Sequence, residues 1–331
     1  MASDSLRFLK ENVVLEAERV HSTFSMDEPG VFHKRDDICD LQTLKEKAQI
    51  KIISEEENRL EFDLIGVDAS FANALRRIII DEIPTMAIEK VFFADNTGLM
   101  HEEMLAHRLG LVPIKADPSL FSERGPNEDA TDYNTLVFTL NVKCERDPND
   151  TSKLINEHVL SGHLVWSPQG GQEERFKDCA PEPAIKDIVI TKLAENQEIE
   201  LQAFCEKGIG QIHAKWSPVC TASYRLMPNI IMKEDVLGEE AVKFSNCFSP
   251  GVIEVVVVNG VKKAVVANPR NDSMSRECLR HKEFEDKVVL ARKRDHFIFL
   301  VESDGRLSAR RIVEDAFKVL TAKCENVKKY L

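Results

Sequence analysis

The sequence lacks the segments that would direct a protein into or across a membrane. It has no run of about 18 apolar residues, which is the length that a membrane-spanning helix requires. Its N-terminus also lacks the order of basic, apolar and small residues that marks a secretory signal. We therefore expect a soluble intracellular protein that does not contact a membrane.

Closely spaced metal ligands are also missing. The closest two of the eight cysteines, Cys205 and Cys220, stand fifteen residues apart, so no C-x-x-C pair exists. His101 and His107 share a predicted helix at a spacing of six instead of the four found in the H-E-x-x-H motif. At 100° per residue their rings point about 120° apart. The sequence thus predicts no metal site and no cofactor.

Recognised catalytic and phosphate-binding strings are absent as well. Neither G-x-S-x-G nor the P-loop nor G-x-G-x-x-G occurs. Gly208 and Gly210 lack a third glycine, and a turn between strands is their ordinary explanation. Trp216 is equally consistent with an interface anchor and with a core residue. We expect no catalytic residue, and hence no enzyme.

The net charge of −12 opposes a primary grip on nucleic acid, which depends on Lys and Arg neutralising phosphates. One stretch, residues 262–294, has ten basic and five acidic residues. Such stretches are usually solvated faces, and we favour contact with protein over nucleic acid. A nucleic-acid-binding module through this stretch and a metallohydrolase through the histidine helix are the two rival readings.

What the sequence does contain is a pair of amphipathic helices. The first, ended by Pro84, has an apolar stripe at helical spacing that consists of Phe71, Leu75, Ile78 and Ile79. Arg76 and Arg77 lie about 100° apart, so at least one must leave that stripe. The second helix, near the C-terminus, repeats apolar residues at intervals of four and three: Val313, Phe317, Leu320, Cys324, Val327 and Leu331. On general grounds a single such seam packs on its own sheet more often than on a partner.

Four segments resemble the α-like subunits of cellular RNA polymerases. They are the FANALRRIII helix, the HEEMLAHRLGLVPI run, KGIGQIHAKWSPV, and the strand and helix from Phe297 onward. The resemblance covers residues 51–331. The RNA polymerase II counterpart carries a cysteine-rich zinc loop where this chain has residues 115–134, which contain no cysteine. This difference favours the larger α-like subunit shared by RNA polymerases I and III over the polymerase II type, which stays the alternative.

The resemblance implies an α+β fold. A discontinuous dimerisation domain, with an antiparallel sheet and two packing helices, would be interrupted by an inserted β-rich domain. We expect an N-terminal arm over 1–45 that orders on a partner and contains a short helix within VVLEAERV. The dimerisation domain would span 46–90 and 220–331, and the inserted domain 91–219.

The resemblance also implies a function and its residues. The chain would be a non-catalytic assembly subunit in the nucleus, including the nucleolus. It would form a heterodimer with the smaller α-like subunit and dock the second-largest subunits of RNA polymerases I and III, contacting nucleic acid only through the complex. The expected dimer interface consists of Phe71, Leu75, Ile78, Ile79, Val313, Phe317, Leu320, Cys324 and Val327. Arg76 and Arg77 are the expected contacts to the large subunit.

Overall fold

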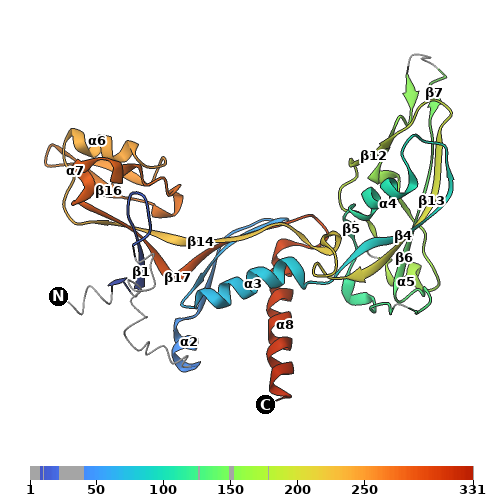
Figure 1. Cartoon of the computed structure of the whole chain (residues 1–331), viewed down its shortest axis with the longest axis horizontal. Coiled ribbons are helices and arrows are strands. Elements are labelled where there is room, and N and C mark those ends of the chain that lie inside the picture. The colour runs from blue at the N-terminus through green and yellow to red at the C-terminus, as the bar shows by residue number, and fades with distance from the viewer. Residues whose placement is uncertain are drawn as a thin grey trace. The chain divides into compact units, whose positions relative to one another are not determined.

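The computed structural model describes residues 8–9, 11–21, 41–125, 127–148, 153–177 and 179–330. It is an α+β protein whose paired strands are antiparallel wherever their register is defined, as expected from the sequence. The chain forms two compact units (Figure 1). Unit 1 contains residues 1–53, 61–73 and 224–299, and unit 2 contains 54–60, 74–223 and 300–331. The expected domain boundaries stay a prediction.

One sheet has the strand order β1-β17-β3-β2, with β14 also paired to β17. Its strands are β1 (Asn12–Leu15), β2 (Gln49–Glu55), β3 (Arg59–Ile65), β14 (Val219–Met232) and β17 (Val288–Ser303). Leu60, Phe62 and Leu64 of β3 are buried at every second position, and Asp63 between them is buried as well. Phe62 stacks on Phe299 with ring centroids 5.0 Å apart. This stacking fixes β3 against β17 within unit 1.

The predicted short helix within VVLEAERV is wrong. Residues 12–15 form strand β1, which pairs with β17 from Asn12 opposite Lys293 to Leu15 opposite Leu290. The β-branched Val13 and Val14 favour a strand, and Leu15 reaches the core of unit 1. This part of the expected arm is therefore ordered on its own chain. Residues 1–7, 10 and 22–40 lie outside the described residues, and for them the expectation stays open.

A small group of helices and strands between the end of β14 and the start of β17 completes unit 1. It contains α6 (Glu239–Asn246), α7 (Lys282–Glu285) and the hairpin of β15 (Ile253–Val258) and β16 (Val261–Val266). Phe244 packs on Phe284 with ring centroids 5.1 Å apart. Asn259 and Gly260 form the hairpin turn with φ values of 52° and 78°, which are the left-handed angles that a two-residue turn requires.

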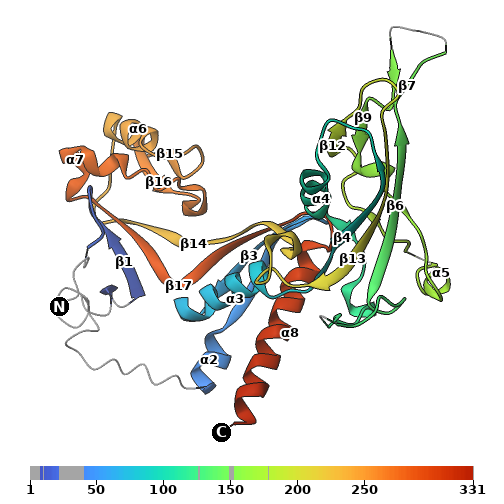
Figure 2. The same cartoon turned by 45° about the vertical axis from the view of Figure 1, so that its right-hand side comes forward.

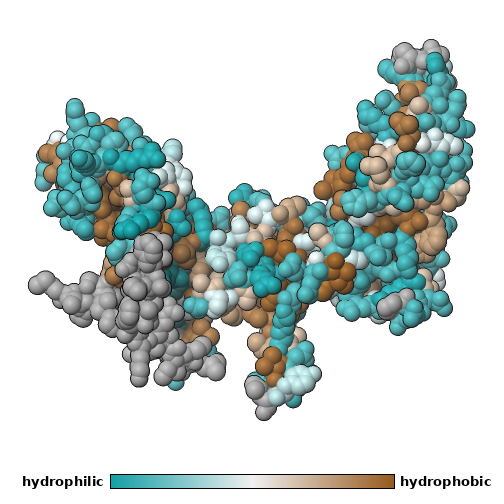
Figure 3. Space-filling view, in the orientation of Figure 1, coloured by the Kyte–Doolittle hydropathy of each residue, from teal (hydrophilic) through white to brown (hydrophobic). Residues whose placement is uncertain are grey.

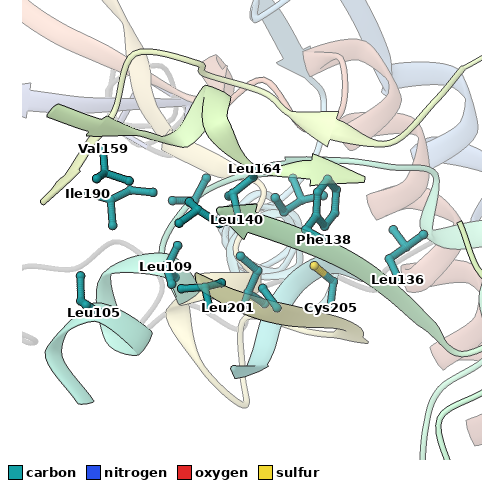
Figure 4. Packing of buried hydrophobic residues seen from close by; sticks show 14 of the residues in the cluster. Leu105, Leu109, Leu136, Phe138, Leu140, Val159, Leu164, Ile190, Leu201 and Cys205 are labelled. Carbon is teal, nitrogen blue, oxygen red and sulfur yellow. The ribbon is translucent and has the colours of Figure 1, made fainter. Parts of the chain in front are cut away.

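Unit 2 contains a four-stranded sheet with the order β10-β6-β13-β4. Strands β6, β13 and β4 are labelled in Figure 2. The strands are β4 (Thr85–Asn96), β6 (Thr135–Lys143), β10 (Val165–Trp166) and β13 (Glu198–Gly208). Helix α4 (Glu102–Gly110) contributes Leu105 and Leu109 to the core on one face of this sheet (Figure 4). The same core includes Phe138 and Leu140 of β6, so the predicted β-rich region has a core of its own.

Three short strand pairs form separate two-stranded sheets in unit 2. The pair β5 (Ile114–Lys115) and β11 (Glu182–Pro183), the pair β9 (His158–Leu160) and β12 (Val189–Lys192), and the pair β7 (Glu145–Arg146) and β8 (Leu154–Ile155) are each antiparallel. The remaining helices are α2 (Leu41–Lys47), α3 (Ala69–Asp81), α5 (Gln172–Arg175) and α8 (Ala309–Lys328). Both expected amphipathic helices, α3 and α8, are therefore present.

Candidate protein-binding surface

Helix α3 buries most of its apolar stripe within the chain. Leu75, Ile78 and Ile79 are each at most 3% exposed, and Phe71 is half-buried. Asp68 accepts a hydrogen bond from the amide of Ser70 at 2.9 Å, so it caps the helix as its sequence position suggests. The stripe is built as predicted. Little of the stripe reaches solvent in the chain alone, and its part in a dimer interface stays a prediction.

The apolar side chains of the α8 seam become more exposed toward the C-terminal end of the helix. Val313 is buried, Phe317 and Leu320 are half-buried, and Cys324 and Val327 are exposed. Every residue from 321 to 330 is exposed, so the apolar side chains at this end of the helix lie in solvent (Figure 3). The first half therefore packs on its own chain, and the second half has no cover within the described residues.

The start of α8 is held by a buried polar network in unit 2. Ser308 caps the helix by accepting from the amide of Arg311 at 3.4 Å. Two residues earlier, Arg306 is 5% exposed and donates to the carbonyl oxygen of Lys215 at 2.5 Å and to Thr85 Oγ1 at 3.2 Å. Asp304 lies 2.8 Å from the Arg306 guanidinium, and burial raises the pKa of Asp304. The network fixes the turn that precedes α8.

Ion pairs add to this anchoring. The guanidinium of Arg311 binds both carboxylate oxygens of Asp117, at 3.1 and 2.6 Å. Burial acts to raise the pKa of Asp117, but hydrogen bonds from Arg311 and Ser119 outweigh it and lower the pKa to about 2. Further along the helix Lys323 pairs with Glu82, just beyond the end of α3. These pairs orient α8 within unit 2.

Gly210 lies in the turn that follows β13, as expected, and both glycines of KGIGQ also permit close packing. A Cβ on Gly208 would lie 2.4 Å from the Trp216 ring, and one on Gly210 would lie 2.4 Å from the carbonyl oxygen of Ile80 in α3. Neither glycine has a positive φ. Trp216 is 5% exposed and donates to the carbonyl of Glu206 at 3.0 Å. The core reading of Trp216 is thus the correct one for this chain.

Arg76 and Arg77 differ in their surroundings. Arg76 is half-buried and forms an interaction within the chain, whereas Arg77 is exposed. Within the described ranges no hydrogen bond or ion pair involves the Arg77 side chain. One of the two arginines therefore leaves the stripe, as predicted, and is available to a carboxylate of a partner. The docking role itself stays a prediction.

Strand β2 carries apolar surface that the sequence patterns did not single out. It lies at the edge of its sheet, and its exposed apolar side chains are Ile50, Ile52 and Ile53, at 53%, 49% and 41% exposure. Edge strands usually carry charge or are covered. The run QIKII contained the signal, but only the strand order shows that it lies at an edge.

The two rival readings, a metallohydrolase and a nucleic-acid-binding module, gain no support from side-chain placement. His101 is the N-cap residue of α4 and His107 lies within the helix, and both are exposed. Among the described residues no group of three His, Cys, Asp or Glu side chains is arranged to hold a metal ion. In the basic stretch Arg270 forms ion pairs with Glu61 and Asp63, both at 2.8 Å, and these carboxylates compensate its charge. Within the residues that the structure describes, no helix is long and apolar enough to cross a membrane.

Comparison with known proteins points to one family. The model of the RNA polymerase Rpb3/Rpb11 dimerisation domain matches residues 61–324. The Bos taurus protein named DNA-directed RNA polymerases I and III subunit RPAC1 is 46% identical, covering 98% of this chain and 96% of that protein. Its Saccharomyces cerevisiae namesake is 44% identical, with 96% and 98% covered. The Dictyostelium discoideum DNA-directed RNA polymerase II subunit rpb3 is 30% identical, with 86% and 95% covered.

Proposed function

The chain belongs to the family of the RNA polymerase Rpb3/Rpb11 dimerisation domain, and we propose that it is the larger α-like subunit shared by RNA polymerases I and III. Relatives named for polymerases I and III are 44–46% identical over nearly the whole chain, whereas the polymerase II relative is 30% identical. This gap favours the shared subunit over the polymerase II type. The lack of cysteine in residues 115–134 agrees with that choice.

Its work is assembly. The chain forms a heterodimer with the smaller α-like subunit, and the heterodimer docks the second-largest subunits of polymerases I and III. It thereby serves transcription of ribosomal RNA, 5S RNA and tRNA in the nucleus, including the nucleolus. It contributes no catalytic group to this nucleotidyltransferase, and it reaches nucleic acid only through the complex.

The proposed pairing rests on one observation, the exposure of the apolar seam in the second half of α8. Burial of one large aliphatic side chain stabilises an association by about 1.5–3 kcal/mol at most. The seam offers Phe317, Leu320 and Val327 in half-buried or exposed positions on one helix face. A facing helix with apolar residues at matching intervals would cover them. The buried first half and its polar anchor hold this surface in place.

Purification of the tagged chain from cells tests the assignment. We expect the smaller α-like subunit and the second-largest subunits of both polymerases to co-purify. Recovery of the second-largest subunit of polymerase II alone would assign the chain to the alternative class. A homodimer without large subunits would contradict the proposal altogether.

A further inference from the structure

The sheet of unit 2 has a second face, turned away from its core, that contains apolar side chains in solvent. Along β13 the inward residues are buried, while Gln202 points outward and is exposed. Phe92, Gln202, Thr139 and Val165 are register neighbours across β4, β13, β6 and β10. Phe92 is 59% exposed and Val165 is 62% exposed. An aromatic and an aliphatic side chain thus stand at the two ends of one row.

Two hollows lie on this outer face and share Gln202 in their linings. The first measures about 380 Å³ and is lined in part by Phe92 and Glu200. The second measures about 360 Å³ and is lined in part by Phe204 and Asp132. The Phe92 and Phe204 rings meet edge to face, with centroids 5.2 Å apart. A segment that crosses Gln202 can therefore place side chains in both hollows.

The charge beside Phe92 is negative and uncompensated. Glu200 and Asp95 are direct cross-strand neighbours, an arrangement in which like charges destabilise a sheet. Neither carboxylate takes part in a side-chain hydrogen bond or an ion pair within the portion of the chain that the structure describes. By contrast, Glu206 on the same face pairs with Arg124, and Asp132 pairs with Arg175 at 3.2 Å. A cation from another molecule would relieve the repulsion between Glu200 and Asp95.

The edge of the sheet is a poorer place for a partner than its face. The pairing of β4 with β13 shifts register at Glu89 and again at Ala94, so β4 has two bulges. Bulges at an edge strand interrupt the regular row of backbone groups that an added strand needs. The bulge at Ala94 also places Phe92 and Asp95 on the same outer face. The aromatic ring and the carboxylate pair are thereby presented together.

We propose that this outer face docks a protein segment in which a Lys or Arg lies beside an apolar side chain. The cation binds between Glu200 and Asp95, and the apolar side chain fills the first hollow against Phe92. The surface consists of residues other than those assigned to pairing or to large-subunit docking. The proposal therefore adds a contact to the proposed function and names the partner by its chemistry.

Site-specific photo-crosslinking in the purified polymerase tests the proposal. A benzoylphenylalanine replaces Gln202 in the tagged full-length chain, and mass spectrometry identifies the cross-linked peptide. Leu99, which is 94% exposed, is the control position. We expect one dominant peptide from another subunit that contains Lys or Arg next to an apolar residue. Glu200→Lys should lower its yield at least tenfold, whereas Glu173→Lys, at an exposed carboxylate elsewhere in unit 2, should leave it unchanged.

A charge exchange completes the test. Replacing the identified cation by Glu should lower the yield with the native chain and restore it with Glu200→Lys. A yield at position 202 no greater than at position 99 would overturn the proposal. So would a cross-link that is insensitive to Glu200→Lys, since it would show proximity without the expected charge recognition.

Discussion

The two halves of α8 share one apolar seam but differ in what covers it. Val313, in the first half, is 8% exposed, whereas Val327, fourteen residues later, is 59% exposed. The same side chain at the same seam position is thus a core residue in one place and a surface residue in the other. Periodicity identifies the face of a helix that is apolar, but it does not identify the molecule that covers that face.

The largest effect should follow from a charge in the buried half. Val313→Asp places a carboxylate in the core, where an unpaired charge costs several kcal/mol. We expect a loss of about 3–5 kcal/mol in the free energy of unfolding of the full chain, measured by urea denaturation. Val327→Asp, on the same seam, is the matched control and should lose less than about 0.5 kcal/mol. Equal losses would show that the two halves do not differ as described.

A charge in the half-buried part of the seam should instead act on pairing. Phe317→Asp or Leu320→Asp leaves an unpaired carboxylate at the interface with the smaller α-like subunit, which outweighs the gain from typical contacts. We expect the co-expressed partner to be lost from the purified complex. Ala322→Asp, on the opposite side of the helix, should retain it. Normal recovery of the partner with both seam variants would mean that the seam faces only its own chain.

The two arginines of α3 should affect a different partner. Truncating an arginine that binds a carboxylate at a desolvated interface costs about 2–5 kcal/mol of binding free energy, whereas truncating a solvated arginine costs almost nothing. We expect Arg76→Ala with Arg77→Ala to retain the heterodimer and to lower capture of the second-largest subunit in a pull-down. The single variant Arg77→Ala separates the exposed arginine from the one already engaged in the chain. Undiminished capture would leave both as ordinary surface and structural residues.

The smallest effect concerns the ion pair that orients the start of α8. The pKa of Asp117 falls from 3.8 to about 2 on folding, so the charged form is favoured in the folded chain. Its contribution is full above pH 4 or so and is lost as the pH falls toward 2. Because Asp117 and Arg311 are each about one-third exposed, we expect Asp117→Asn to cost at most about 1 kcal/mol. Urea denaturation at pH 6 and pH 3 should show a smaller difference at pH 3, and Asp129→Asn should show none at either.

The helices and most strands follow from local pattern, because burial of one face imposes a period on the sequence. The α3 stripe, the β3 alternation and the α8 seam are each visible in this way. The roles of Gly208, Gly210 and Arg306 are not, because each depends on a neighbour that is remote in the sequence. Strand β1 does not follow from local pattern either, because its four residues have no partner in the local sequence and its pairing with β17 spans most of the chain.

Protection of Cys324 from alkylation is the most direct test of whether the second half of α8 is the pairing surface. This seam cysteine is exposed in the chain alone, as is Cys179 outside the seam, whereas Cys205 is buried with a raised thiol pKa. The full chain is treated with iodoacetamide alone and in complex with the smaller α-like subunit, and each cysteine is read by mass spectrometry. We predict at least a tenfold slower reaction of Cys324 in the complex, with Cys179 unchanged and Cys205 unreactive in both. Equal reaction of Cys324 in the two states would contradict the claim that the second half of α8 is the pairing surface.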